Sequence, residues 1–228
     1  IIIYRKKPEI LFLDSSSLGI LSLISRIISP STRVISFFHN IEYDFQKERS
    51  KKEGLFYVIT AAAEFFNEKL STVFSRSLLM LNQEDSNRSR LLYGRNADYI
   101  TPVVFDASYI PSPSDCQEKK IFLFVGSNFF ANRQAVEFII NEISPLIHDE
   151  SKIEIWIAGS GFSANQWEGG LPSNVKMLGR VENLIPLYKK ACATIAPIFS
   201  GAGMKVKVAE SLMHGRPVIG TDLSLDRK

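Results

Sequence analysis

The residues best suited to chemistry lie between Ser200 and Thr221, in the stretch SGAGMKVKVAESLMHGRPVIGT. Gly201 and Gly203 precede a predicted helix, and the first amides of any helix lack partners within it. A phosphate binds well at such an end, because the free N–H groups and the positive end of the helix dipole both attract it. Lys207 and Glu210 share one face of the helix, where a lysine suits phosphate charge and a carboxylate suits sugar hydroxyls. This segment therefore predicts a site for a nucleotide-sugar.

The same spacing allows a second interpretation. Lys207 and Glu210 stand three residues apart, so they also fit a surface ion pair worth about 0.2–0.5 kcal/mol, and the residues alone leave both open. His214 lies on the same face, but near the helix C-terminus a histidine is also favourable on dipole grounds. The packed side of this helix is predicted to consist of Val206, Val208, Ala209, Leu212 and Met213.

The elements that position this segment alternate regularly after residue 120. Short apolar runs followed by glycine predict buried parallel strands, and apolar residues at helical spacing predict the helices between them. Such alternation is typical of a doubly wound parallel sheet. The predicted strands are 121–125, 153–158, 175–178, 193–196 and 218–219, and the predicted helices are 135–143, 184–191 and 204–214.

Ligands of open parallel sheets bind beyond the carboxyl ends of the strands. Most of these exits here carry glycine, which lets a ligand approach the backbone closely. The residues that directly follow the strands, and that are candidates for ligand binding, include Gly126, Ser127, Gly159, Gly161, Arg180 and Val181.

The first part of the chain repeats this alternation less regularly, with strands predicted at 10–13, 34–37, 78–81 and 99–100 and helices at 18–28 and 55–74. A stretch rich in proline and serine, 108–118, reads as a linker, with an ordinary surface loop as the alternative. The sequence thus predicts two α/β domains, 1–112 and 113–228. The first domain is expected to lack its opening strands, and the chain reads as a fragment cut at both ends.

His39 follows an apolar strand of the first domain, where it would face the ligand edge of the sheet. A lone histidine in that place more often simply ends a strand. Asp14 and Asp85 are loop carboxylates for which the sequence offers no partner. Three histidines and two cysteines, all widely separated, provide no metal-ligand spacing.

Composition restricts the function classes. The chain of 228 residues is 45% hydrophobic with a net charge of +3, divided as +2 on residues 1–112 and +1 on the rest. Because neither half is a basic arm, charge gives no argument for nucleic acid. Two cysteines favour a reducing cytosol. No uncharged apolar run reaches the ~18 residues of a transmembrane helix.

Several motifs in order resemble the group 1 (family 4) glycosyltransferases of GT-B fold. Gly201 to Glu210 matches the G-x-G-x-K-x-K-x-x-E stretch of a subset of that family, and the continuation to Ile219 is similar to its E-A-x-x-x-G-x-P-V-V element. The resemblance covers nearly all of residues 120–222. The quoted pieces also include FVGS at 124–127 with Asn132-Arg133, IAGSG at 157–161, LGRV at 178–181 and FFHNIE at 37–42.

The resemblance implies two Rossmann-like domains, the second binding the donor, and transfer of a sugar from a nucleoside diphosphate sugar with retention. It implies no metal and no cofactor, an acceptor that is a glycan, a lipid-linked molecule or a small molecule, and a role in polysaccharide biosynthesis. It gives His39 and Glu210 catalytic places, Glu210 at the ribose. The donor-binding residues that it implies are Gly126, Ser127, Arg133, Gly159, Gly161, Arg180, Val181, Gly201, Gly203, Lys205 and Lys207.

The sequence departs from the family pattern at two places. Many members carry two glutamates separated by seven residues, and Ala202 stands where the first would be. Ser127 replaces the usual arginine after the first strand of the donor domain, which leaves Arg133 as the cation for the diphosphate. Two rival functions stay open, a non-catalytic relic that binds nucleotide-sugars and a sugar-nucleotide epimerase of the same fold.

The stretch from Lys47 to Phe66 pairs a basic cluster with an apolar helix. Peripheral contact with an anionic membrane that carries a lipid-linked acceptor is one interpretation. Core packing of the apolar side, with a solvated charge run, is the interpretation that the sequence favours. The expected location is the cytoplasm, with the inner face of the membrane as an alternative.

Overall fold

A computed structural model describes residues 5–104, 120–148, 152–167, 170–200 and 206–225. These residues form two compact units, one that ends at residue 104 and one that begins at residue 120. The predicted linker and the boundary at 112 fall within 105–119, outside the described residues, so the boundary itself stays a prediction.

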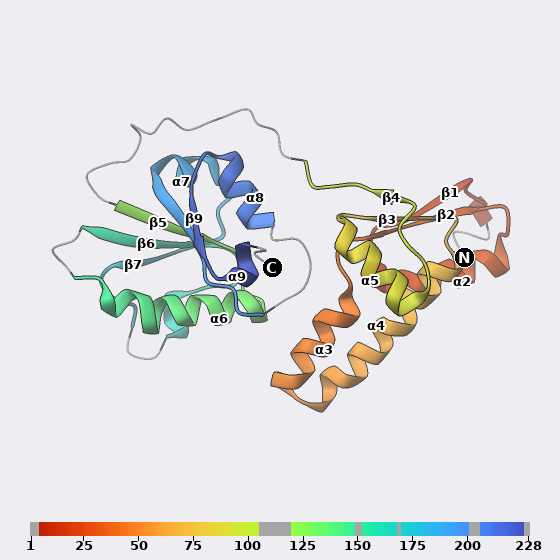
Figure 1. The fold of residues 1–228 in the computed structure, drawn as a ribbon, viewed down its shortest axis with the longest axis horizontal. Coiled ribbons are helices and arrows are strands. Elements are labelled where there is room, and N and C mark those ends of the chain that lie inside the picture. The colour runs from red at the N-terminus through yellow and green to blue at the C-terminus, as the bar shows by residue number, and fades with distance from the viewer. Residues whose placement is uncertain (1–4, 105–119, 149–151, 168–169, 201–205, 226–228) are drawn as a thin grey trace. The chain divides into compact units, whose positions relative to one another are not determined.

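The first unit contains a four-stranded parallel sheet in the order β1-β2-β3-β4 (Figure 1). Leu13 at the end of β1 is level with Ser36 in β2, so the carboxyl ends of both strands meet at one edge. All four strands agree with the sequence prediction to within one residue at either end. Their bounds are Ile10–Leu13, Arg33–Phe38, Ser77–Met80 and Tyr99–Ile100.

Helices α2 (Gly19–Ile28) and α4 (Leu55–Phe74) of this unit cross at very short range. A Cβ atom at Gly19 would lie 1.7 Å from the carbonyl oxygen of Asn67, so only glycine fits there. The hydroxyl of Ser22 donates to the Leu70 carbonyl at 3.1 Å. The serine content of α2 therefore serves close helix packing, and a short 3₁₀ turn, Ser16–Leu18, leads into it.

The sequence analysis missed two helices, α3 (Glu42–Glu53) and α5 (Gln83–Tyr93). Neither has an apolar stripe, which is the signal that periodicity needs. Helix α5 is instead defined by its ends, because the Asn82 side chain accepts from the Asp85 amide at 2.7 Å and Gly94 takes a left-handed φ of 84°.

A distant side chain caps the beginning of α3. The buried carboxylate of Glu68, on α4, accepts from the amides of Glu42 at 2.7 Å and Tyr43 at 3.2 Å. These donors have no partners within α3. The N-terminus of α3 is thus capped by a residue 26 positions further along the chain, and no local sequence pattern predicts that contact.

The second unit contains a five-stranded parallel sheet in the order β7-β6-β5-β8-β9. Strands β6 and β7 follow β5 towards one edge of the sheet, and β8 and β9 then extend the sheet on the other side of β5. This is the doubly wound arrangement. The reversal lies between β5 and β8, where such sheets bind ligands. The strands are β5 Lys120–Val125, β6 Ile153–Ala158, β7 Val175–Gly179, β8 Ala191–Ala196 and β9 Val218–Gly220.

Helices cover both faces of this sheet, with α6 on one face and α7 on the other (Figure 1). Phe124 and the inner side of α6 share one core cluster, and Leu123 packs with Tyr188 of α7 in the other. Alternate residues of β5 thus enter opposite cores. The bounds are α6 Phe130–Phe138, α7 Ile185–Lys190, α8 Val206–Met213 and α9 Asp222–Leu225, with a π-helical turn at Ile139–Ile143 and 3₁₀ turns at Ser144–Leu146 and Ala164–Gln166.

Helix α8 is oriented differently from the prediction. Leu212, assigned to the packed side, is 60% exposed, and Val206 is also exposed. Ser211 and His214 are buried instead. The hydroxyl of Ser211 forms a hydrogen bond of 2.7 Å with that of Thr194 in β8, so this helix packs partly through polar contacts.

Candidate functional site

A cavity of about 380 Å³ opens at the carboxyl ends of β5, β6 and β7 in the second unit. Three consecutive strand exits form it, as the doubly wound fold predicts. It contains five of the residues named from the sequence, Gly126, Ser127, Gly159, Arg180 and Val181. Its remaining lining residues are Val125, Ala158, Ser160 and Leu184.

Two glycines bring the strand exits close together. A Cβ atom at Gly159 would lie 1.8 Å from the carbonyl oxygen of Gly126, so no other residue fits without moving the backbone. The amide of Gly126 donates to the Ala158 carbonyl at 2.9 Å, and that of Gly159 to the Gly179 carbonyl at 2.7 Å. The cavity floor is therefore a fixed backbone surface that a ligand can approach closely.

Lys207 enters this region from α8. Its ammonium donates to the side-chain oxygen of Asn132 and lies 4.8 Å from the ring centroid of Phe124 in β5. The buried Asn132 amide in turn donates to the Ser127 carbonyl at 2.8 Å. One asparagine thus ties a lysine to the first strand exit, and the sequence analysis did not include Asn132 among the site residues.

A second asparagine holds Arg133 and the loop after β6. The Arg133 guanidinium donates to the side-chain oxygen of Asn128 at 3.3 Å. The Asn128 amide donates to the Gly161 carbonyl at 2.8 Å. Arg133 and Gly161 therefore lie next to the first strand exit, although they do not line the cavity. Asn128 directly follows Gly126 and Ser127 at this strand exit, but it was not among the donor-binding residues predicted from the sequence.

Glu210 has two aromatic neighbours in the second unit, and its predicted contact with the ribose stays a prediction. It lies beside Tyr188, and both burial and this carboxylate raise the pKa of the Tyr188 hydroxyl. The Tyr188 ring stacks on that of His214 at 4.4 Å between centroids, and burial lowers the pKa of His214. Tyr188 shares a hydrophobic cluster with Val181 and Leu184 of the cavity wall, and Glu210 is not among the residues that line the cavity.

Gly201, Gly203 and Lys205 lie outside the described residues, so their predicted roles stay predictions. Within the part of the chain that the structure describes, no group of three or more histidine, cysteine, aspartate or glutamate residues could hold a metal ion.

In the first unit His39 stands just beyond β2, as predicted, and it has a partner. Its Nε2 atom lies 2.9 Å from the carboxylate of Asp14, which follows β1. The His39 ring also packs on Phe37, with centroids 4.6 Å apart, and about half of its side chain is exposed. The sequence analysis left Asp14 without a partner, although adjacent parallel strands place the two exits together. Asp85, by contrast, is part of the α5 cap.

Comparison with solved structures places both units in a known fold. The chain is similar to HepE from Anabaena in complex with UDP-glucose, with a TM-score of 0.64 and 15% identity over 93% of this chain and 59% of that one. A variant of S. aureus TarM, in complex with fondaparinux, alpha-GlcNAc-glycerol and UDP, gives a TM-score of 0.65 and 11% identity over 93% and 41%. The catalytic domain of Arabidopsis thaliana starch synthase IV, bound to ADP and acarbose, gives 0.55 and 10% over 97% and 58%.

These likenesses establish the GT-B fold. The chain spans about two fifths to three fifths of the length of the solved structures that it matches. Residues 119–227 match the family described as glycosyl transferases group 1. No curated protein gives a significant match.

Proposed function

We propose that this chain, whose residues 119–227 belong to the group 1 glycosyltransferases, takes part in sugar transfer from a nucleoside diphosphate sugar to an acceptor. The observation that carries the proposal is the cavity at the exits of β5, β6 and β7, with its close glycine backbone and the cations beside it. Phosphate oxygens need donors and positive charge, and both occur at this edge of the sheet.

The diphosphate is proposed to lie over Gly126 and Ser127. Arg133 and Lys207 are held next to this exit by Asn128 and Asn132, and Arg180 lies on the cavity wall. In this proposal these cations supply the positive charge that the departing nucleoside diphosphate requires, without a metal or another cofactor. The asparagines keep two of the cations in place before the donor binds, which reduces the ordering cost of binding.

His39 is proposed to contact the donor sugar from the first unit. If Nε2 carries the proton that Asp14 accepts, Nδ1 of the neutral ring is an acceptor for a sugar hydroxyl. Asp14 is then a positioning residue, which fixes the tautomer and the orientation of the ring. Retention of configuration remains part of the proposal as an implication of the family resemblance.

The ribose contact predicted for Glu210 also remains a proposal. The nearness of Glu210 to Tyr188 and His214 favours an alternative in which its carboxylate supports the wall formed by Val181 and Leu184. The two roles predict different effects of substituting Glu210 on nucleotide affinity and on stability.

A lipid-linked or glycan acceptor and peripheral membrane contact are proposed on a second observation. Leu55, Phe56 and Phe66 of α4 are each at least 67% exposed, so the core packing favoured from the sequence is wrong for these side chains. An exposed apolar face beside the basic residues Lys47, Arg49 and Lys51 in the second half of α3 is typical of helices that lie on anionic membranes. None of the described helices is long and apolar enough to cross a membrane.

A transfer assay with a panel of nucleotide-sugars on the intact gene product tests the proposal. His39→Ala should lower turnover about 10²-fold or more, as is typical for one positioned catalytic group, while nucleotide affinity stays nearly constant. Asp14→Asn should lower turnover less, because the ring remains present. Full turnover without the imidazole would remove His39 from the mechanism, and epimerised donor in the absence of acceptor would identify an epimerase instead.

A further inference from the structure

A second cavity, of about 280 Å³, lies in the first unit at the opposite edge of the sheet from His39. It is formed where α2 ends and where β2 and β3 begin. Because β2 has six residues, its beginning and its end are about 20 Å apart. The cavity therefore belongs neither to the His39 edge nor to the second unit. Its lining residues are Arg26, Pro30, Ser31, Thr32, Arg33, Val34, Val73, Phe74, Ser75 and Arg76.

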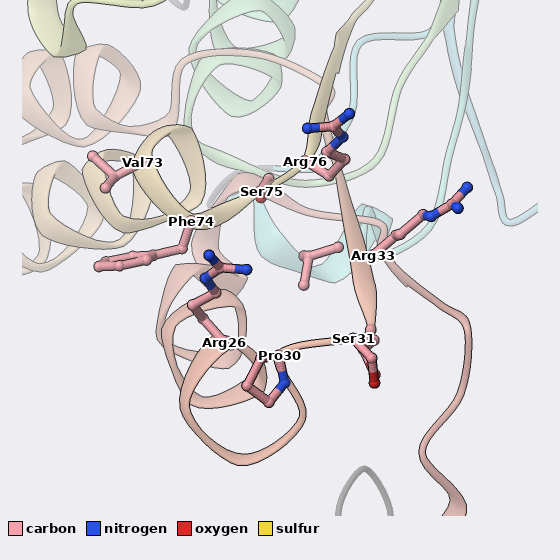
Figure 2. A pocket seen from close by; sticks show the side chains of 10 residues that line it. Arg26, Pro30, Ser31, Arg33, Val73, Phe74, Ser75 and Arg76 are labelled. Atoms are coloured by element: carbon pink, nitrogen blue, oxygen red, sulfur yellow. The ribbon is translucent and has the colours of Figure 1, made fainter.

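Three of the lining residues are arginines, and none is acidic. Figure 2 shows that they come from three places: Arg26 from the last turn of α2, Arg33 from the start of β2 and Arg76 from just before β3. The Arg33 side chain extends away from that of Arg26 in this view, and both residues line the cavity. All three side chains are exposed to solvent.

These arginines differ from others in the same unit. Arg88 forms two hydrogen bonds of 2.7 Å with Asp44, and Arg95 pairs with Asp98 at 2.6 Å. Within residues 5–104, the guanidinium groups of Arg26, Arg33 and Arg76 form no hydrogen bond or ion pair. Three like charges around one cavity repel one another, and a bound anion would relieve that repulsion.

The segment before β1 adds positive charge to this edge. The hydroxyl of Thr32 donates to the Pro8 carbonyl at 2.7 Å, and the Arg33 amide donates to the Glu9 carbonyl at 2.8 Å. These bonds hold the segment that contains Arg5, Lys6 and Lys7 against the start of β2, where Glu9 is its one acidic residue.

Apolar side chains lie directly beside the cations. Val73 lines the cavity and is 55% exposed, and Ile27, next to Arg26 in α2, is 69% exposed. Phe74 forms another part of the wall. A ligand that joins an anionic head to an apolar body would contact both kinds of surface.

We propose that this cavity binds a phosphate ester through Arg26, Arg33 and Arg76. Guanidinium groups present paired N–H donors that match the oxygens of a phosphate, and the cavity has room for one such group. A soluble phosphate ester and the headgroup of a phospholipid share this chemistry. The site lies in another unit and at another edge from the donor cavity, so it does not depend on the proposed function.

The test maps binding of glycerol phosphate to the full chain by amide chemical shifts. The proposal expects saturable shifts at Val34, Ser75 and Arg76, in a set separate from any shifts at Gly126 and Gly159. The double variant Arg26→Gln/Arg76→Gln should weaken the first set at least tenfold and leave the second unchanged. The matched control, Arg90→Gln/Lys120→Gln, removes the same charge from exposed positions that line neither cavity and should change affinity less than twofold.

A second arm identifies the source of the phosphate. Co-sedimentation is measured with vesicles of phosphatidylglycerol and phosphatidylcholine, and with phosphatidylcholine alone. Retention on the anionic vesicles that is lost in the arginine double variant, but not in the control, would assign a lipid headgroup. Glycerol phosphate binding without such retention would assign a soluble ester. Equal behaviour of the two double variants in both arms would overturn the proposal, as would the absence of glycerol phosphate shifts at Val34, Ser75 and Arg76 together with equal retention on both kinds of vesicle.

Discussion

Two asparagines hold the cations that lie beside the cavity of the second unit. Asn132 is buried and joins Lys207 to the Ser127 carbonyl, and Asn128 joins Arg133 to the Gly161 carbonyl. Without these links two long side chains would have to be ordered by the ligand, at about 0.5–1.5 kcal/mol each. The site therefore relies on residues that carry no charge themselves.

Glu210 provides a test that separates binding from support. Glu210→Gln keeps the size of the side chain and removes its charge. If Glu210 accepts from the ribose hydroxyls, nucleoside diphosphate affinity should fall about tenfold, with the melting temperature nearly unchanged. Tyr188→Phe serves as the comparison, because it alters the neighbour of Glu210 without touching a ligand. A loss of stability in Glu210→Gln with affinity intact would make Glu210 a supporting residue only.

Glu68 should make the stability of the first unit depend on pH. Burial raises the pKa of its carboxyl from 4.5 to about 7. The folded chain then holds a proton between pH 4.5 and 7 that the unfolded chain releases, so stability is greatest below pH 4.5 as far as this group is concerned. It falls as pH rises towards 7, by roughly 3 kcal/mol in total.

The measurement is urea denaturation between pH 4.5 and 8, followed through the amide signals of α4. Glu68→Gln should remove this decline, since glutamine does not titrate. Glu64→Gln, a change four residues away on the same helix, is the control and should retain it. The raised pKa of Glu68 would be contradicted if the wild-type unit became more stable between pH 4.5 and 8 and Glu68→Gln removed that increase.

At the scale of elements, the crossing of α2 and α4 depends on one glycine. Gly19→Ala would place a methyl group 1.7 Å from the Asn67 carbonyl oxygen if nothing moved, so the helices must separate. We expect a loss of about 1–3 kcal/mol, the usual cost of overpacking. Thermal unfolding of the variant measures it. Gly94→Ala is a useful comparison, because space is open there and only its left-handed φ of 84° opposes the change.

The strands were predictable because each is a short apolar run that ends at a turn. The nine strands of the described residues all agree with the prediction to within two residues at either end. Helices α3 and α5 were not, because their polar sequences lack periodicity. The start of α3 depends on Glu68, whose position is fixed only when α4 has packed. A contact between residues so far apart in the chain cannot be predicted from the local sequence.

Only some features of the candidate site could be predicted from the sequence. Gly126, Gly159 and Arg180 could be placed from the sequence, because residues after parallel strands meet at one edge. The surroundings of Glu210 could not, since they depend on how α8 rotates against α7. That rotation buries His214 and exposes Leu212, against the apolar pattern of the helix.

At the scale of the whole molecule, the two units carry different chemistry. The second has a cavity at the carboxyl ends of its strands, beside Arg133 and Lys207. The first has the His39–Asp14 pair at its carboxyl edge and the arginine cavity at its amino edge. Nucleotide binding is therefore expected from the second unit, and the first is expected to contribute a contact to the sugar.

The most direct test is calorimetric titration of the chain with UDP, ADP and GDP. At least one of them should bind saturably, and Arg133→Ala should weaken this binding about tenfold to a hundredfold, because a charge-assisted contact is worth ~1.5–3 kcal/mol. Arg90→Ala, an exposed arginine of α5, is the matched control and should leave affinity unchanged. Binding of none of the three nucleotides, or equal affinity in both variants, would contradict the account.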